Sequence, residues 1–295
     1  MLFQDSDCTK LGEFKEFPLN FEGILQLQVI AQNVLAVLAA KGLFIVNLLS
    51  NACERLEFDD VQRIQCLSAE SLMLVQGHRD VWMYDFNNQS IALHKQFAQE
   101  IRTCAWGKGE LVIVLGDCVI LFDSNGDMLF SRSFPVINDV VDVHKLDDKL
   151  IVTSRHQLQV FSNVLESIEV SCEMSNPVTG TVFCENDGVF QLVLKAEFSD
   201  FLFTISNEDN ILSHRRIFSP TVGTTGISSI EDVILLVSDT VLCTVDELFN
   251  IDMKFLHAND EKRIVSCAVM SDIFIIGFSD GSLFICDHKF VKEQE

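Results

Sequence analysis

The run of residues that looks most reactive is Cys286-Asp287-His288, near the C-terminal end of the chain. A thiol close to an imidazole could form a nucleophile and its base, the pairing used in covalent catalysis. The run lies in a strand-like segment, however, where neighbouring side chains point to opposite faces. We therefore expect it to be structural and not catalytic.

Other catalytic or ligand-binding motifs are missing from the sequence. The stretch WGKGE (106–110) lacks the spacing of a phosphate-binding loop, and no Cys or His spacing indicates zinc. The seven histidines are scattered, and we expect them at the surface or rim. The sequence thus predicts a protein that is not an enzyme and has no catalytic, cofactor-binding or metal-binding residues.

Charge and cysteine content limit the partners and the compartment. The chain carries 21 Lys and Arg against 43 Asp and Glu, a formal net charge of −22, which disfavours direct contact with nucleic acid or insertion into membranes. None of the ten cysteines forms a C-x-x-C pair, and no signal peptide is evident. We expect an intracellular protein, cytoplasmic or nuclear, in a reducing compartment.

The elements that position all these residues form a repeat. Residues 264–287 contain three apolar strand-like runs joined by tight turns, the second turn being Asp280-Gly281. Similar units begin near residues 24, 61, 101, 140, 178, 222 and 264. Such a regular period in units made only of strands indicates radial repetition. The longest apolar stretch, 34–49, is interrupted by Lys41-Gly42 and is predicted to be a hairpin within this pattern.

A fourth strand follows in six of the units, but the last unit has almost no chain left for one. The segment 11–17 has no unit of its own, so we expect it to pair with 282–287 and close the ring. The prediction is an all-β, seven-bladed β-propeller with four-stranded antiparallel blades. It covers residues 11–295, preceded by an N-terminal arm over 1–10.

On these residues the sequence resembles the WD-repeat β-propeller family over nearly its whole length. The Asp that ends the family's third strand is kept in Tyr84-Asp85, Phe122-Asp123 and Cys286-Asp287, whereas the Trp before it is replaced each time. The family's Gly-His pair is missing from its usual place, so the family's stiffening hydrogen-bond network is expected to be absent. Such degenerate repeats are similar to those of propellers in nuclear-pore, vesicle-coat, tethering and RNA-processing assemblies.

Placed on a propeller, the acids gather on one face. In each blade the turns between strands one and two and between strands three and four lie on the same face, and we expect an acidic protein-binding surface there. Its candidate residues are Asp147, Asp148, Glu185, Asp187, Glu231 and Asp232. The alternative is that these acids serve turn formation and solubility.

A longer turn in the fifth unit adds Phe198 as a candidate contact. An exposed aromatic side chain there could meet a partner. Alternatively, the Phe198 side chain could fold back onto the sheet of its own unit.

Three functions remain open. The leading one is a non-enzymatic scaffold for protein–protein interaction, acting as one subunit of a larger intracellular assembly. The alternative is an acidic chaperone or carrier of a basic protein, such as a histone or ribosomal protein. An enzyme is the third, because propellers of other families include hydrolases and lyases, and it would need polar groups converging on the central channel.

Overall fold

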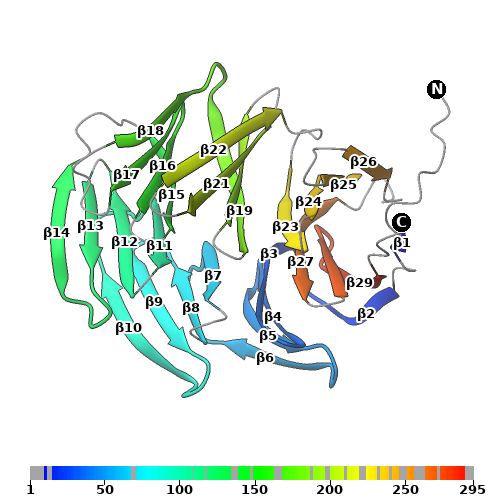
Figure 1. Cartoon of the computed structure of the whole chain (residues 1–295). Helices are drawn as coiled ribbons and strands as arrows, with labels where there is room; N and C mark the ends of the chain where they lie inside the picture. Colours follow the sequence, from blue (N-terminus) through cyan, green and yellow to red (C-terminus); the bar gives the residue numbers. More distant parts are fainter. Residues whose placement is uncertain are drawn as a thin grey trace.

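The computed structural model describes residues 10–11, 15–67, 71–107, 109–116, 118–133, 139–146, 149–162, 168–186, 189–196, 200–208, 211–218, 224–230, 233–238, 241–245, 251–255, 263–270 and 273–289. Every regular element in these ranges is a β-strand (Figure 1). No helix that could cross a bilayer occurs in this described part of the chain. Most of the predicted arm lies outside it, so the arm stays a prediction.

The strands form seven antiparallel sheets, which we number as blades 1 to 7. Blade 1 contains β3 (Ile24–Ala31), β4 (Val34–Ala39), β5 (Gly42–Asn47) and β6 (Ala52–Leu56). Blade 2 contains β7 (Arg63–Leu67), β8 (Leu72–Gln76), β9 (Asp80–Asp85) and β10 (Ser90–Gln96). Blade 3 contains β11 (Thr103–Gly107), β12 (Glu110–Leu115), β13 (Cys118–Phe122) and β14 (Met128–Ser133). Blade 4 contains β15 (Val140–Leu146), β16 (Lys149–Ser154), β17 (Gln157–Ser162) and β18 (Ile168–Glu173).

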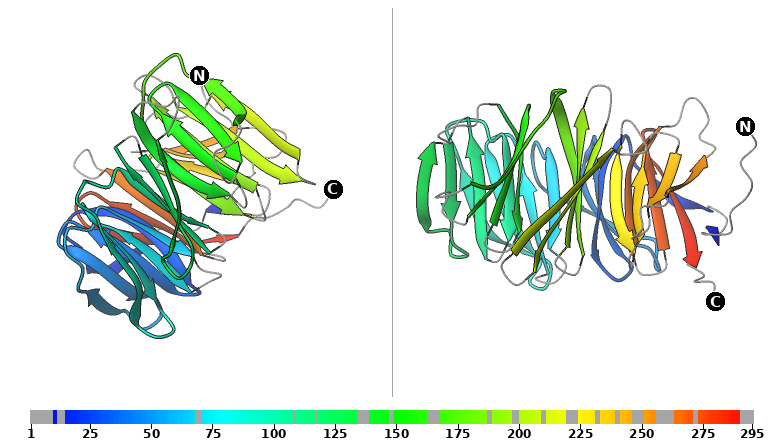
Figure 2. Two further views of the ribbon diagram at one scale, coloured as in Figure 1. Left: turned by 90° about the vertical axis from the view of Figure 1, so that its left-hand side faces the viewer. Right: turned by 45° about the horizontal axis from the view of Figure 1, so that its top comes forward.

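The remaining blades follow the same order. Blade 5 contains β19 (Val178–Asn186), β20 (Val189–Ala196), β21 (Phe201–Glu208) and β22 (Ile211–Phe218). Blade 6 contains β23 (Gly226–Ile230), β24 (Val233–Val237), β25 (Val241–Val245) and β26 (Ile251–Phe255). Blade 7 contains β27 (Ile264–Met270), β28 (Ile273–Phe278) and β29 (Ser282–Lys289), completed by β2 (Lys15–Asn20) and the short β1 (Lys10–Leu11). In the right-hand view of Figure 2 the strands of most blades stand side by side along the ring axis.

The ring closes through the N-terminal segment, as the sequence predicts. Lys15 of β2 lies opposite Ile285 of β29, and β1 continues along the same strand with Leu11 opposite His288. The predicted propeller with four-stranded antiparallel blades is therefore confirmed. The predicted hairpin over 34–49 is also present, with Ala39 opposite Gly42.

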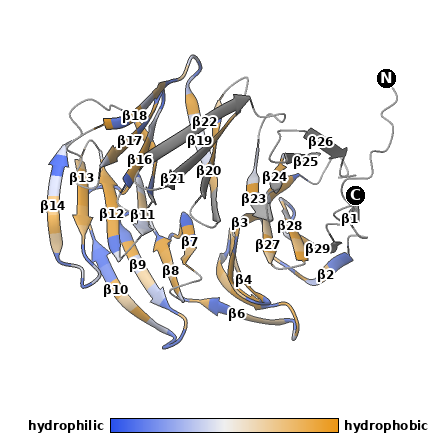
Figure 3. Cartoon of the chain, viewed as in Figure 1, coloured by the Kyte–Doolittle hydropathy of each residue, from blue (hydrophilic) through white to orange (hydrophobic). Residues whose placement is uncertain are grey.

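The core lies between the blades. Each strand has two apolar faces where it is covered by both neighbouring sheets, which is why the middle strands β12 and β13 are mostly hydrophobic in Figure 3. One apolar cluster joins blades 1 and 2 through Leu38, Leu43 and Met73, and similar clusters follow around the ring. Burying such a side chain fully stabilises the fold by about 1.5–3 kcal/mol. The cluster between blades 7 and 1 includes Phe17 and Phe21 of the closing segment.

Candidate functional site

The innermost strands of the blades are linked by side-chain hydrogen bonds to the backbone of the next blade. The Gln26 amide of β3 donates to the Ile64 carbonyl oxygen (2.8 Å) and accepts from the Ile64 N–H (3.0 Å). Gln65 of β7 repeats this with Trp106 of β11, accepting from its N–H at 3.2 Å. A side chain that satisfies both backbone groups of a neighbouring strand fixes the register of one blade against the next.

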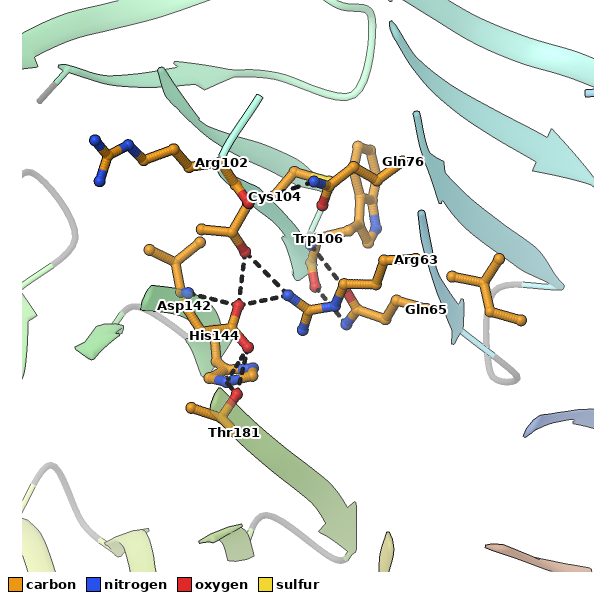
Figure 4. A network of polar contacts seen from close by, with 12 residues as sticks. Arg63, Gln65, Gln76, Arg102, Cys104, Trp106, Asp142, His144 and Thr181 are labelled. Atoms are coloured by element: carbon orange, nitrogen blue, oxygen red, sulfur yellow. Dashed lines mark hydrogen bonds and ion pairs between the residues drawn. The ribbon is translucent and has the colours of Figure 1, made fainter. Parts of the chain in front are cut away.

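A cluster of polar side chains surrounds Asp142 at the inner edge of blade 4 (Figure 4). One carboxylate oxygen accepts from the Thr103 hydroxyl (2.6 Å) and the Val143 N–H (2.8 Å), and also pairs with the Arg63 guanidinium. The other oxygen accepts from the Thr181 hydroxyl. These residues lie on β7, β11, β15 and β19, so a single carboxylate joins four successive blades. We call Arg63, Thr103, Asp142, His144 and Thr181 the channel cluster.

The channel cluster holds Asp142 in its charged form. Burial by itself raises the pKa of this carboxyl group, but the neighbouring Arg63, the His144 ring and the hydroxyls of Thr103 and Thr181 outweigh it. They hold the pKa well below its usual range, because each of them stabilises the anion. The same ion pair raises the pKa of Arg63 despite its burial.

His144 is the buried histidine of this cluster, with 2% of its surface exposed, which corrects the expectation that the histidines lie at the surface or rim. Its ring lies 4.3 Å from the ring of Phe183. Burial lowers its pKa to about 4; the carboxylate of Asp142 opposes this lowering in part, and Arg63 adds a smaller lowering. His144 is therefore neutral at pH 7.

Thr181, His144 and Asp142 bring together the residue types of a nucleophile, a base and an acid. In a working relay the base takes the nucleophile's proton on one ring nitrogen while the acid orients the other nitrogen. Here Thr181 Oγ1 and Asp142 Oδ2 both lie 3.4 Å from the same atom, His144 Nε2, and the Thr181 hydroxyl already donates to Asp142. This geometry ties the blades together and does not activate a nucleophile.

A cavity of about 320 Å³ occupies the central channel beside the cluster. Arg63, Asp142 and Thr181 line it together with residues of β3, β23 and β27. The Arg63 guanidinium lies 5.9 Å from the centre of the Phe183 ring, a cation–π contact at the cavity wall. Among the described residues, no three His, Cys, Asp or Glu side chains are grouped to hold a metal ion.

The protein-binding residues predicted from the sequence are not tested by the structure. Asp147, Asp148, Asp187, Phe198, Glu231 and Asp232 lie outside the described residues. Glu185 lies in β19 opposite Phe190, and only its backbone is described. Of Cys286-Asp287-His288, likewise, only the backbone within β29 is described.

The acids that end the third strands have a local role. Asp85 accepts from the N–H of Asn87 (2.8 Å) and Asp123 accepts from that of Asn125 (2.9 Å), so each carboxylate caps the turn leading to the fourth strand. Asn47 does the same in blade 1, accepting from Leu49 N–H at 3.0 Å. Hydrogen bonds from Asn88 lower the pKa of Asp85. Asp85 and Asp123, two of the Asp residues kept at this position, are thus turn caps.

Sequence reasoning did not find the channel cluster. The only indication of it in the sequence is the stretch VVDVHKL (140–146), in which Asp142 and His144 lie on the same face of a largely apolar strand. Arg63, Thr103 and Thr181 stand in three other units, and nothing in their local sequence relates them to Asp142.

Comparison with known proteins supports the fold. No protein-family model and no curated protein matches the sequence. Among solved structures, a chain of "Crystal Structure of Mitotic Checkpoint Complex" matches with a TM-score of 0.70 and 12% identity, covering 97% of this chain and 94% of the other. The Neurospora crassa Pan2 WD40 domain matches with a TM-score of 0.69 and 8% identity, covering 96% of each chain. The computationally designed Ika8 protein matches with a TM-score of 0.61 and 12% identity, covering 92% and 100%. The predicted resemblance to WD-repeat propellers is confirmed as a resemblance of fold.

Proposed function

We propose that this protein is a non-enzymatic scaffold for protein–protein interaction and one subunit of a larger intracellular assembly. The observation that supports this most directly is how the channel cluster uses its polar groups. Asp142 accepts from Arg63, Thr103, Val143 N–H and Thr181, so its bonding capacity serves the joining of blades. Recognition then falls to the exposed turns.

The similar solved structures agree with this proposal. One is, by its title, a chain of the mitotic checkpoint complex, and another is the WD40 domain of Pan2. Both are WD40-like propellers, a fold that typically presents rigid faces to other proteins.

The test is purification of the full-length protein from its own cells, followed by cross-linking mass spectrometry. We expect one or more protein partners in stoichiometric amount, cross-linked to lysines on one face of the ring. A solitary monomer under gentle extraction conditions would contradict the proposal.

A second candidate is a carrier of a basic protein, which the net charge of −22 favours. Long-range attraction between opposite charges accelerates encounter and is screened by salt. Binding to the purified partner that slows steeply between low and physiological salt would favour the carrier. Association that is insensitive to salt would favour the scaffold.

A further inference from the structure

Most of the exposed large apolar side chains in the described part of the chain lie at equivalent places in different blades. Five of the six large apolar residues that are exposed in the described part of the chain lie where a blade's third strand turns into its fourth. The most exposed are Leu49 (77%) and Met128 (62%). We call the five residues the rim row: Leu49, Ile91, Met128, Leu129 and Ile168.

Three of these residues occupy equivalent positions in successive blades. Ile91, Met128 and Ile168 each lie at the start of a fourth strand, opposite an aromatic residue of the third strand. The aromatic partners are, in order, Tyr84, Phe122 and Phe161. Each ladder also has a one-residue irregularity immediately after this pair, so that Ala92, Leu129 and Glu169 have no residue opposite them. Repetition in three blades distinguishes this arrangement from apolar residues scattered singly over a surface.

The rim row continues from one blade to the next. The turn of blade 3 at Gly126 is close to β10 of blade 2, because a Cβ at Gly126 would lie 2.6 Å from Leu93 Cδ1. Lys95 of β10 lies 5.2 Å from the ring centre of Phe122. In Figure 1 the outer strands β6, β10, β14 and β18 follow one another around the outside of the ring.

The irregularities indicate how a partner docks. A bulge bends and twists an edge strand, which hinders a further strand from pairing with it. Recognition along these fourth strands therefore depends on side chains and not on an added strand.

The charges next to the rim row indicate the chemistry of the partner. The four connections between third and fourth strands in blades 1 to 4 are residues 47–52, 85–90, 122–128 and 162–168. They contain Asp85, Asp123, Asp127 and Glu166, and no Lys, Arg or His. Lys95 also lies close to the row, at the Phe122 ring, but the charged residues within the connections are all acids. Apolar side chains beside such acids complement a segment that carries aliphatic or aromatic residues among Lys and Arg.

We infer that the rim row binds an extended, basic and apolar segment of a partner protein, running along the outside of blades 1 to 4. An extended segment fits because the apolar residues form a row, distributed at one or two per blade over four successive blades, and not one compact patch. This inference rests on the proposed function and adds to it the surface used and the kind of partner.

The test is site-specific photo-cross-linking of the full-length protein in its own cells. The photoreactive residue p-benzoylphenylalanine replaces Leu49, Ile91, Met128 or Ile168, one at a time. Matched controls place it at exposed positions near the other end of the same outer strands, at Gln96, Ser133 and Glu173. Because all these sites are exposed, folding should be unchanged, and circular dichroism checks this.

We expect rim-row positions in at least two different blades to cross-link to one continuous segment of the same partner. That segment should be rich in Lys, Arg and apolar residues, and the control positions should give at most a tenth of the cross-linked product. Cross-links only from the control positions, or to an acidic segment, would overturn the inference. So would a partner that co-purifies in stoichiometric amount without any rim-row cross-link, an outcome that leaves the scaffold function intact. A protein that co-purifies with nothing contradicts the scaffold function itself.

A binding measurement provides the second readout. A synthetic peptide of the cross-linked segment should bind the variant Leu49→Ser, Ile91→Thr, Met128→Gln, Ile168→Thr at least tenfold more weakly than the unaltered protein. Equal affinity for both proteins would overturn the inference.

Discussion

Asp142 shows how one buried carboxylate can stabilise a ring. An unpaired charge in the interior destabilises a protein strongly, whereas a charge with several donors is tolerated. Asp142 takes its donors from four blades, Arg63 in blade 2, Thr103 in blade 3, the backbone of its own blade and Thr181 in blade 5. Its removal therefore affects the contacts between blades.

The first prediction concerns the variant Asp142→Asn. The amide leaves the partly buried Arg63 guanidinium without its counter-charge, and we expect the free energy of unfolding to fall by about 2–3 kcal/mol. Urea denaturation followed by circular dichroism measures it. Asp127→Asn, in an exposed turn, is the control and should change stability by no more than about 0.5 kcal/mol. If both variants unfold at the same urea concentration, the cluster does not contribute to stability as described.

The second prediction concerns the pH dependence of stability that His144 causes. Since burial lowers its folded pKa to about 4, the unfolded chain binds a proton on this ring at a higher pH than the folded one does. The stability that His144 contributes is complete above the ordinary His pKa of about 6.5 and is lost as pH falls towards 4, by about 1.4 kcal/mol for each pH unit. The Asp142 contribution is lost only below the ordinary Asp pKa of about 3.9, outside this window.

The measurement is urea denaturation of the unaltered protein and of His144→Gln at pH 7, 6, 5 and 4. Comparing the two proteins removes the effect of all other titrating groups. The stability of the unaltered protein should fall relative to the variant across this range. Parallel pH profiles would show that His144 does not titrate as proposed.

Among the elements, the turn between β28 and β29 requires its Asp280-Gly281 sequence. Gly281 has a φ of 93°, a conformation that residues with a side chain rarely adopt. A Cβ added there would lie 1.2 Å from the Phe21 carbonyl oxygen. Phe21 N–H donates to the Gly281 carbonyl oxygen (2.8 Å), and Asp280 accepts from Ser282 N–H (3.0 Å). The turn is thus shaped for contact with the closing segment.

The third prediction follows for Gly281→Ala. The added methyl group must displace the Phe21 backbone, so we expect a loss of stability on the order of 3 kcal/mol or more. Gly116→Ala is the matched control, since Gly116 also has a positive φ (61°) but no atom within 4 Å of an added Cβ. The Gly116→Ala variant should lose only about 1–2 kcal/mol of stability, because a residue with a side chain is strained at this positive φ. Equal thermal shifts for the two variants would contradict the role given to Phe21.

At the scale of the whole molecule, closure joins residues from the two ends of the chain. The β2 and β29 pairing brings Phe17 and Phe21 into the core between blades 7 and 1. Without β2, the apolar face of blade 7 and the edge of β29 would be exposed to solvent, a state prone to aggregation.

The fourth prediction concerns the deletion of residues 1–20. The core contacts of this segment contribute several kcal/mol to the free energy of folding, so their loss should lower the melting temperature by about 10 °C or more, or cause aggregation. Differential scanning calorimetry and light scattering follow both outcomes. Deleting residues 1–9 alone, which leaves β1 and β2 in place, is the control. A 1–20 deletion that melts like the full chain would refute closure by this segment.

The fifth prediction concerns the binding of a basic partner to the acidic protein-binding surface expected from the sequence. Charge reversal of Asp147, Asp148, Glu231 and Asp232 together should lower the association rate and its salt dependence. The control reverses Asp80, the first residue of β9, together with Asp59, Asp117 and Asp239, which by their place in the sequence stand between strands on the face that we expect to be the opposite one. Stopped-flow association kinetics distinguish the two sets. Equal losses from both would mean that only net charge matters.

The sequence predicts the ring well because each blade can be recognised from one short stretch of sequence, which contains three apolar runs and a tight turn. It predicts the channel cluster poorly, because Arg63, Asp142 and Thr181 become neighbours only once the blades are arranged in a circle. The rim row was also missed, since the sequence predicts a fourth strand over Met128 and Leu129 but not which of its apolar side chains are exposed. Their exposure depends on which strand is outermost, a property of the assembled sheet.

The closing strand also has a consequence for the order of synthesis. On the ribosome β2 is made before blades 1 to 6, whereas its partner β29 emerges only after them. Blade 7 therefore stays incomplete until β29 has emerged, and β2 must remain unpaired while six blades are made. Joining residues so distant along the chain is slow, because the entropy of a long loop is lost before the new contacts form. We expect the newly made chain to depend on chaperones during this interval, and a bulky tag placed close before β1 to impair its maturation.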